Sequence, residues 1–358
     1  MDLSLFKDPN RAKGLIESIK AIAPESATLM EVCGTHTVSI ARAGIRGLMP
    51  EGVKLASGPG CPVCVTSNHD LDVIMAFTKI PEITVASFGD MIRVPGSTTN
   101  LINRKAQGAP VEVCYSPLDA LAYAQHHPDR EVVFAGVGFE TTTPLVAIAI
   151  KRAHAMNIKN FSVYCAHKNV PGALEVIVND PQLKIDALIL PGHVSTIIGT
   201  NPYEFLAKEY GIPGVVTGFE PLDLLQGIAM ILLQLNQGRA DIEIAYTRGV
   251  MKEGNPVAVT AIDEVFETCT ANWRGLGEIP GSGYKIREKY ADFDALVRFS
   301  PEIEPVVEHA GCKCGDVLRG RISPDECKLF RGTCSPENPI GPCMVSSEGS
   351  CAAYYRYY

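Results

Sequence analysis

Short apolar runs alternate with helix-like stretches over the first 240 residues. Runs such as Val132–Ala135 and Ala187–Leu190 are apolar throughout, which is typical of strands buried on both faces of a parallel sheet. Their alternation with helical patterns predicts doubly wound α/β layers. The expected strands are Thr28–Cys33, Lys54–Ser57, Ile83–Ser87, Val111–Cys114, Glu131–Gly136, Phe161–Cys165, Ala187–Leu190 and Gly214–Thr217, and the expected helices are Asp70–Phe77, Leu118–Gln125, Pro144–Met156, Ala173–Val178 and Leu222–Leu235.

The length of 358 residues favours more than one domain. We expect two doubly wound parallel-sheet domains and an irregular C-terminal iron–sulfur domain, because Gly and Pro become frequent after residue 240. The expected bounds are residues 1–117, 118–240 and 241–358, and exchange of segments between the two α/β domains stays open. Similar motifs at 138–141 and 218–221, each between a strand and a helix, weakly suggest internal duplication.

Composition and charge exclude several classes of protein. Hydrophobic residues make up 46% and charged residues 20% of the chain, which excludes wholesale disorder. The net charge of −8 argues against a nucleic-acid partner, because binding to phosphates needs a clustered excess of Lys and Arg. The sequence has no apolar run long enough for a membrane span and no signal-peptide pattern, so we expect a cytoplasmic protein without a membrane partner.

Cysteine is the unusual component: the chain has 12, and six of them lie from Cys312 onward. Cytosolic thiols stay reduced, so clustered cysteines there indicate metal or redox chemistry. Four dispersed soft ligands suit a [4Fe–4S] cluster, whereas structural zinc usually takes tight CxxC pairs and remains the alternative. Cys312 and Cys314 could replace ligands or lie beside them. The favoured ligands are spaced C-x6-C-x8-C-x7-C and are Cys327, Cys334, Cys343 and Cys351.

Two further cysteine motifs follow predicted strands. Cys33 lies just beyond a strand end, where ligands bind in open α/β sheets, although it could simply be buried. His36, three residues later, could be a second ligand, a proton donor or a hydrogen-bond partner. Cys61 and Cys64 form the only CxxC of the chain, and two thiols at this spacing can cycle between dithiol and disulfide. Half of a zinc site is the other interpretation of this pair.

Two polar motifs occupy equivalent places after other strands. Glu140 precedes three threonines at a helix start, where helix capping alone would explain the hydroxyls. His193 follows the strand Ala187–Leu190 and could otherwise be an ordinary loop residue. Because ligands bind at the carboxyl ends of parallel strands, these motifs together predict a shared cleft. Cys114 and Cys165 are expected to be buried strand residues.

Taken together and in order, these motifs resemble the HypD family of [NiFe]-hydrogenase maturation proteins. The resemblance covers roughly residues 30–358. It rests on Cys33-Gly34-Thr35-His36, Gly58-Pro59-Gly60-Cys61-Pro62-Val63-Cys64, Gly138-Phe139-Glu140-Thr141-Thr142, Pro191-Gly192-His193, Trp273-Arg274-Gly275-Leu276-Gly277 and the tail from Gly341 to Cys351.

The resemblance implies a scaffold that acts with the small protein HypC while an iron atom receives cyanide and carbon monoxide. HypE would supply the cyanide in a transient complex, and the Fe(CN)2CO unit would pass to the hydrogenase. Cys33 would bind the iron, Cys61 and Cys64 would form a redox pair, and the tail [4Fe–4S] cluster would relay electrons to them. The chain on its own is expected to be a monomer.

His36, Glu140 and His193 could then donate hydrogen bonds to cyanide nitrogens or shuttle protons. Two other functions stay open on the residues alone. A free-standing iron–sulfur thiol–disulfide reductase would use the CxxC pair but would not need Cys33. A zinc-organised interaction protein would transfer no electrons.

Overall fold

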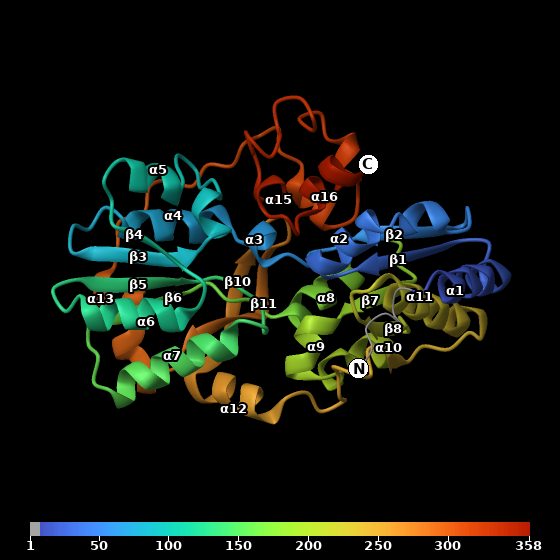
Figure 1. Cartoon of the computed structure of the whole chain (residues 1–358), viewed down its shortest axis with the longest axis horizontal. Helices are drawn as coiled ribbons and strands as arrows, with labels where there is room; N and C mark the ends of the chain where they lie inside the picture. Colours follow the sequence, from blue (N-terminus) through green and yellow to red (C-terminus); the bar gives the residue numbers. More distant parts are fainter. Residues whose placement is uncertain (1–7) are drawn as a thin grey trace.

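The computed structural model describes residues 8–358 and contains two parallel sheets that lie side by side (Figure 1). The larger sheet has the strand order β2-β1-β7-β8-β9, and the smaller has the order β4-β3-β5-β6. All neighbouring strands within both sheets are parallel. The strands are β1 (Ala27–Glu31), β2 (Val53–Ser57), β3 (Ile83–Phe88), β4 (Val111–Cys114), β5 (Glu131–Gly136), β6 (Phe161–Cys165), β7 (Ala187–Pro191), β8 (Gly214–Thr217) and β9 (Ile242–Ile244).

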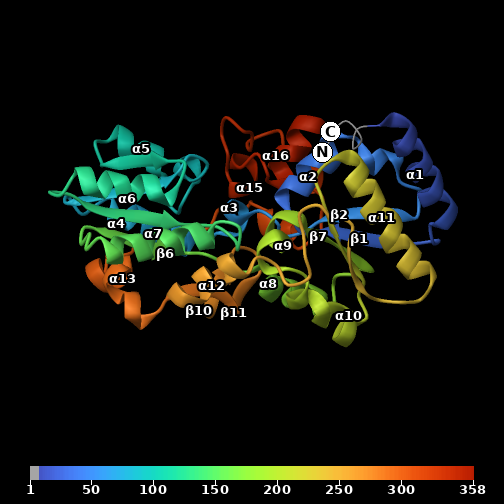
Figure 2. The same cartoon turned by 60° about the horizontal axis from the view of Figure 1, so that its bottom comes forward.

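Helices cover both faces of each sheet, so both are doubly wound as expected (Figure 2). On the five-stranded sheet, α1, α2 and α11 pack on one face around Ile19, Ile40 and Ile228. The helices are α1 (Pro9–Ile22), α2 (Gly34–Arg42), α3 (Pro62–Val65), α4 (Asn68–Phe77), α5 (Leu101–Ala106), α6 (Pro117–His126), α7 (Thr143–Ala155), α8 (Val170–Val178), α9 (Gly192–Ile198), α10 (Glu204–Tyr210), α11 (Pro221–Asn236), α12 (Pro256–Val265), α13 (Ala295–Phe299), α14 (Cys314–Leu318), α15 (Pro342–Val345) and α16 (Ser350–Tyr357).

The predicted elements of the first 240 residues are confirmed to within a few residues, and the helix starts show why. Ser116 caps α6: its side chain accepts from the Leu118 N–H at 3.1 Å, while Asp119 accepts from the Ser116 N–H at 2.9 Å. Ser67 caps α4 in the same manner through the Asp70 N–H. Local side-chain chemistry therefore fixes these boundaries.

The two α/β domains exchange segments, because the strands of the larger sheet come from before and after those of the smaller sheet in the chain. β1 and β2 belong to one sheet with β7, β8 and β9, while the chain between residues 83 and 165 forms the other sheet. A division at residue 117 would place β3 and β4 in one domain and β5 and β6 of the same sheet in the other. The expected bounds 1–117 and 118–240 therefore do not follow the sheets. Parallel strands pair through long crossover connections, so the local pattern does not reveal their neighbours.

Residues 241–358 connect the two sheets. The antiparallel strands β10 (Phe266–Trp273) and β11 (Gly277–Ile286) form a hairpin that lies between the sheets (Figures 1 and 2). The segment after Phe299 is mostly irregular, as expected, and carries the short helices α14, α15 and α16. No helix in the described part of the chain is both long and apolar enough to cross a membrane.

Candidate functional site

Both sheets have a switch point where the strand order reverses, and these are the places where open α/β sheets bind ligands. In the five-stranded sheet the reversal falls between β1 and β7, which lead directly to Cys33 and His193. In the four-stranded sheet it falls between β3 and β5, and Glu140 follows β5. Three of the predicted site residues therefore flank a switch point.

Cys33 is buried at the N-cap of α2, so the first helical N–H groups surround its thiol. Burial raises the pKa of this thiol to about 11, the N–H of His36 opposes that effect, and the charge of Glu348 adds to it. At neutral pH the thiol is therefore protonated. A metal ion that binds here must displace this proton.

His36 is fully buried beside the end of β8. Its Nε2 lies 3.1 Å from the Gly218 carbonyl oxygen and 3.0 Å from Thr217 Oγ1, whereas its Nδ1 has no partner. Burial lowers the pKa of His36 to about 4, so the ring is neutral. Since Nε2 faces a carbonyl oxygen, it carries the hydrogen and leaves a free lone pair on Nδ1.

His193 joins this group through an aromatic side chain. The rings of His193 and Phe219 stack with centroids 3.8 Å apart, and the centroid of the His36 ring lies 5.0 Å from that of the same phenyl ring. Partial burial lowers the pKa of His193, while the carboxylate of Glu348 acts in the opposite direction. The structure thus brings Cys33, His36 and His193 together, as the strand-end positions predict.

The CxxC motif lies directly against the Cys33 segment. Cys61 and Cys64 form a disulfide with Cα atoms 5.2 Å apart, and both are buried. The Gly34 N–H donates to the Gly60 carbonyl at 2.9 Å, and a Cβ atom on Gly60 would run into the backbone of Cys33. Only glycine at position 60 allows this close approach.

Glu348, to which we assigned no role from the sequence, connects the tail to the same site. Its carboxylate accepts a hydrogen bond from Thr35 Oγ1 at 2.7 Å, and a Cβ atom on Gly34 would lie 2.6 Å from that of Glu348. The tail motif containing Glu348 resembled the family, but neither spacing nor periodicity indicated its partner. The contact became visible only with the fold.

The tail cysteines lie next to these motifs. Helix α15, which carries Cys343, packs against α3 of the CxxC motif, and α16, which carries Cys351, packs against α2. Cys61, Cys64 and four tail cysteines belong to one continuous apolar core. The dithiol and the tail thiols therefore lie in the same interior.

Within the tail, the thiols that touch differ from the predicted quartet. Cys314, Cys343 and Cys351 contact one another, and hydrogen bonds to Cys314 and then to Cys343 lower the pKa of Cys351 to about 6. Cys312 contacts Cys314, and Cys334 Sγ accepts the Ile340 N–H at 3.4 Å. A Cβ atom on Gly341 would lie 2.5 Å from Cys314 Sγ and 2.7 Å from Cys312 Sγ. Cys327 is half-buried and is not part of these contacts.

These residues suit a multi-iron cluster. Within residues 8–358 no three His, Cys, Asp or Glu side chains surround one point closely enough to hold a single metal ion. A cubane presents a separate iron atom to each cysteine, so its ligands need not converge on one point. Several soft thiols in an apolar surrounding, one of them accepting a backbone N–H, fit such a group.

Glu140 lies apart from the Cys33 group. It is fully buried: one oxygen accepts the Val170 N–H at 3.0 Å, and the other has no partner. Burial raises the pKa of Glu140 to about 7. The buried Tyr203 is close enough to both Glu140 and Cys33 for their charges to raise its pKa, after burial as the main cause. Tyr203 is thus a neighbour that Glu140 and the Cys33 site share.

Comparison with known proteins identifies the chain. The family model HypD, described as the hydrogenase formation hypA family, matches residues 10–358. The hydrogenase maturation factor HypD of Rhodobacter capsulatus is 47% identical, over 99% of this chain and 97% of that protein. The HypD proteins of Azotobacter vinelandii and Escherichia coli K12 are 46% and 42% identical, over 98% of this chain and 95% and 96% of their own lengths. The chain therefore belongs to the HypD family of hydrogenase maturation factors.

Proposed function

We propose that this maturation factor holds an iron atom on Cys33 while the iron acquires cyanide and carbon monoxide, together with a small HypC-type partner and a transient HypE-type cyanide donor. The iron and its ligands are the cargo of this reaction, and Cys33 is the thiol that follows β1 directly at the β1–β7 switch point. A single protein thiolate leaves other iron positions open for the partner and the diatomic ligands.

The observation that carries this proposal is that Cys33 adjoins the segments of two other kinds of thiol, the CxxC pair and the tail cysteines, which share one core. Cys33 touches the CxxC loop through Gly60, and the tail reaches Cys33 through Glu348. A thiolate site that receives electrons from other thiols of the same chain requires such packing. A free-standing thiol–disulfide reductase would not need the Cys33 group.

The side chains near Cys33 would have separate roles. Neutral His36 is held by Gly218 and Thr217, so its ring cannot rotate freely, and its Nδ1 is an acceptor that would not donate to a cyanide nitrogen. His193 stacks on Phe219 and is half-exposed, so it could exchange protons with solvent. Cys61 and Cys64 would take up two electrons and two protons as their disulfide becomes two thiols.

The tail thiols would hold the [4Fe–4S] cluster, which supplies single electrons when bound. On the contacts above, we propose Cys314, Cys334, Cys343 and Cys351 as ligands, with Cys314 in place of Cys327. Cys312 would remain a thiol beside the cluster. Helix α15 would then carry one ligand against the helix that carries Cys64.

Infrared spectroscopy of the anaerobically co-purified complex tests the iron site. The wild-type protein, produced with its maturation partners, should show bands of iron-bound cyanide and carbon monoxide. Cys33→Ala should lose them, whereas Cys114→Ala, which alters a thiol at the edge of the other sheet, should keep them. Bands that persist in Cys33→Ala, or that never appear in the wild type with all partners present, would contradict the proposal.

Iron and sulfide analysis tests the ligand assignment. Cys314→Ala and Cys343→Ala should lose iron, sulfide and the visible sulfur-to-iron charge-transfer absorbance, while Cys327→Ala should retain all three. The reverse result, with the cluster lost in Cys327→Ala and kept in Cys314→Ala, would restore the quartet predicted from spacing. Stoichiometric zinc in a colourless wild-type protein would exclude the cluster.

A further inference from the structure

Arg274 is a buried cation that lacks a carboxylate partner. Its side chain is 9% exposed, its Nε donates to the Thr66 carbonyl at 3.0 Å, and its guanidinium also donates to Asn68. Both partners are neutral, and Arg274 forms no ion pair anywhere in the described range 8–358. Glu308 and Asp316 line the same cavity as Arg274 but form no ion pair with it in that range. Burying a charge without an ion-pair partner is costly, so this guanidinium indicates a nearby negative charge other than a carboxylate bonded to it.

The backbone around Arg274 bridges the two redox elements. The Arg274 N–H donates to the Val65 carbonyl at 2.8 Å, and Trp273 forms a β-bridge with Thr66 directly after the CxxC helix. On its other side, Gly275 packs against Gly315 in α14, and Arg319 donates to the Gly275 carbonyl. The tip of the β10–β11 hairpin is therefore fixed between the dithiol helix and the tail segment that carries Cys314.

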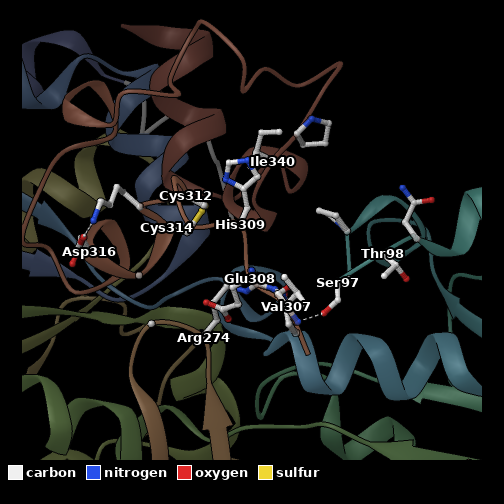
Figure 3. A pocket seen from close by; sticks show the side chains of 18 of the residues that line it. Ser97, Thr98, Arg274, Val307, Glu308, His309, Cys312, Cys314, Asp316 and Ile340 are labelled. Carbon is white, nitrogen blue, oxygen red and sulfur yellow. Dashed lines mark hydrogen bonds and ion pairs between the residues drawn. The ribbon is translucent and has the colours of Figure 1, made fainter. Parts of the chain in front are cut away.

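The guanidinium and the tail thiols line the same cavity. Arg274, Cys312 and Cys314 contribute to the wall of a cavity of about 670 Å³, which Ser97, Glu308 and Asp316 also line (Figure 3). Arg274 therefore shares a cavity wall with Cys314, which the proposed function makes a cluster ligand.

We propose that Arg274 is the fixed counter-cation of the iron–sulfur cluster held by the tail cysteines and sets its reduction potential. This inference rests on the cluster of the proposed function. Each cysteine ligand brings a negative charge, and reduction adds one more electron to the cluster. A fixed positive charge in a poorly screened interior favours the more negative, reduced state and so raises the potential.

The test is a spectroelectrochemical titration of the purified, anaerobic full-length protein. Arg274→Gln removes the charge and should shift the midpoint potential of the cluster to a more negative value. Arg274→Lys keeps the charge and should stay close to the wild type. The matched control is Lys285→Gln, because Lys285 carries an exposed positive charge on β11 of the same hairpin, paired with Glu267. It should leave the potential unchanged.

Each other outcome has a defined meaning. An unchanged potential in Arg274→Gln, or an equal shift in Arg274→Lys, overturns the role of the charge while leaving the cluster in place. Loss of the cluster in Arg274→Gln but not in Arg274→Lys supports a need for the charge, and loss in both makes the residue structural and overturns the proposal. A wild-type protein without iron and sulfide overturns the proposed cluster itself.

Discussion

Because Gly34 has no side chain, Glu348 of the tail can pack closely against the Cys33 site. The main-chain oxygen of Glu348 would lie 2.7 Å from a Cβ atom at position 34, so an alanine there forces Glu348 and its loop to move. Gly34→Ala should therefore destabilise the protein by roughly 1–3 kcal/mol, the usual cost of overpacking. Thermal unfolding of the anaerobic protein measures this loss.

Gly14→Ala is the matched control, because a Cβ atom there meets nothing within 4 Å in the middle of α1. That change should stabilise the helix by about 0.5–1 kcal/mol. Equal melting temperatures for Gly34→Ala and the wild type would show that the contact with Glu348 is loose.

Glu140 makes stability depend on pH. Its pKa is about 7 in the folded protein and 4.5 as a free side chain, so between these values the folded state binds more protons and loses stability as pH rises. A difference of about 2.5 units corresponds to about 3 kcal/mol at 1.36 kcal/mol per unit. Glu140→Gln should match the wild type near pH 4.5 and gain stability over it up to pH 8. A pH-independent difference in unfolding free energy would contradict this assignment.

The candidate site could be predicted in part from single residues. Cysteines, glycines and histidines just after apolar runs identified Cys33, His36, the CxxC pair and His193, because parallel strands end at the same edge of a sheet. Glu348 and Cys314 could not be assigned in this manner. Their partners are hundreds of residues away or lie in a segment without periodicity, so only the folded chain brings them to the site.

The β10–β11 hairpin is one of the elements that the sequence did not predict, as are α1, α10, α12 and β9. Its outward face is polar and its tip is rich in glycine, so the run resembled a loop, yet the buried Trp273 fixes it in place. The indole N–H donates to Ser282 Oγ at 2.8 Å, and the ring stacks on Phe139 with centroids 5.7 Å apart. The hairpin is therefore held by tertiary contacts more than by its own pattern.

Removal of one hydroxyl tests this anchoring. Ser282→Ala leaves the buried indole N–H without its acceptor and should cost about 1–3 kcal/mol. Trp273 is the only tryptophan, so its fluorescence reports the unfolding of the hairpin in denaturant. Ser18→Ala, at an exposed position of α1, should leave the midpoint near that of the wild type. An identical midpoint for Ser282→Ala would contradict the anchoring role.

The two sheets share a strand order, but the repeated motif does not follow it. In both sheets the second strand along the chain lies outside the first, and later strands are added on the other side. The motif at 138–141 follows the third strand of its sheet, whereas the motif at 218–221 follows the fourth. The similarity of those residues is thus no evidence for duplication, although the matching strand orders would allow it.

At the scale of the whole molecule, the chain crosses between sheets and returns. β1 needs β7 as its inner neighbour, and 155 residues separate the end of β1 (residue 31) from the start of β7 (residue 187). A fragment of residues 1–117 would contain β1 and β2 without β7, and β3 and β4 without β5. It should show no cooperative thermal transition by circular dichroism, whereas the whole chain should show one. Cooperative unfolding of the fragment would mean that the sheets are less dependent on each other than their strand order indicates.

The central claim is that the tail cluster, the CxxC pair and Cys33 form one connected thiol system. The direct measurement is anaerobic reduction with a one-electron photoreductant, followed by alkylation and mass spectrometry of Cys61 and Cys64. Protein with its cluster should yield both cysteines alkylated after two electrons per chain, and Cys343→Ala, which lacks the cluster, should yield far less at the same exposure. Equal alkylation in the two proteins would show that electrons reach the disulfide without the tail and would contradict the account.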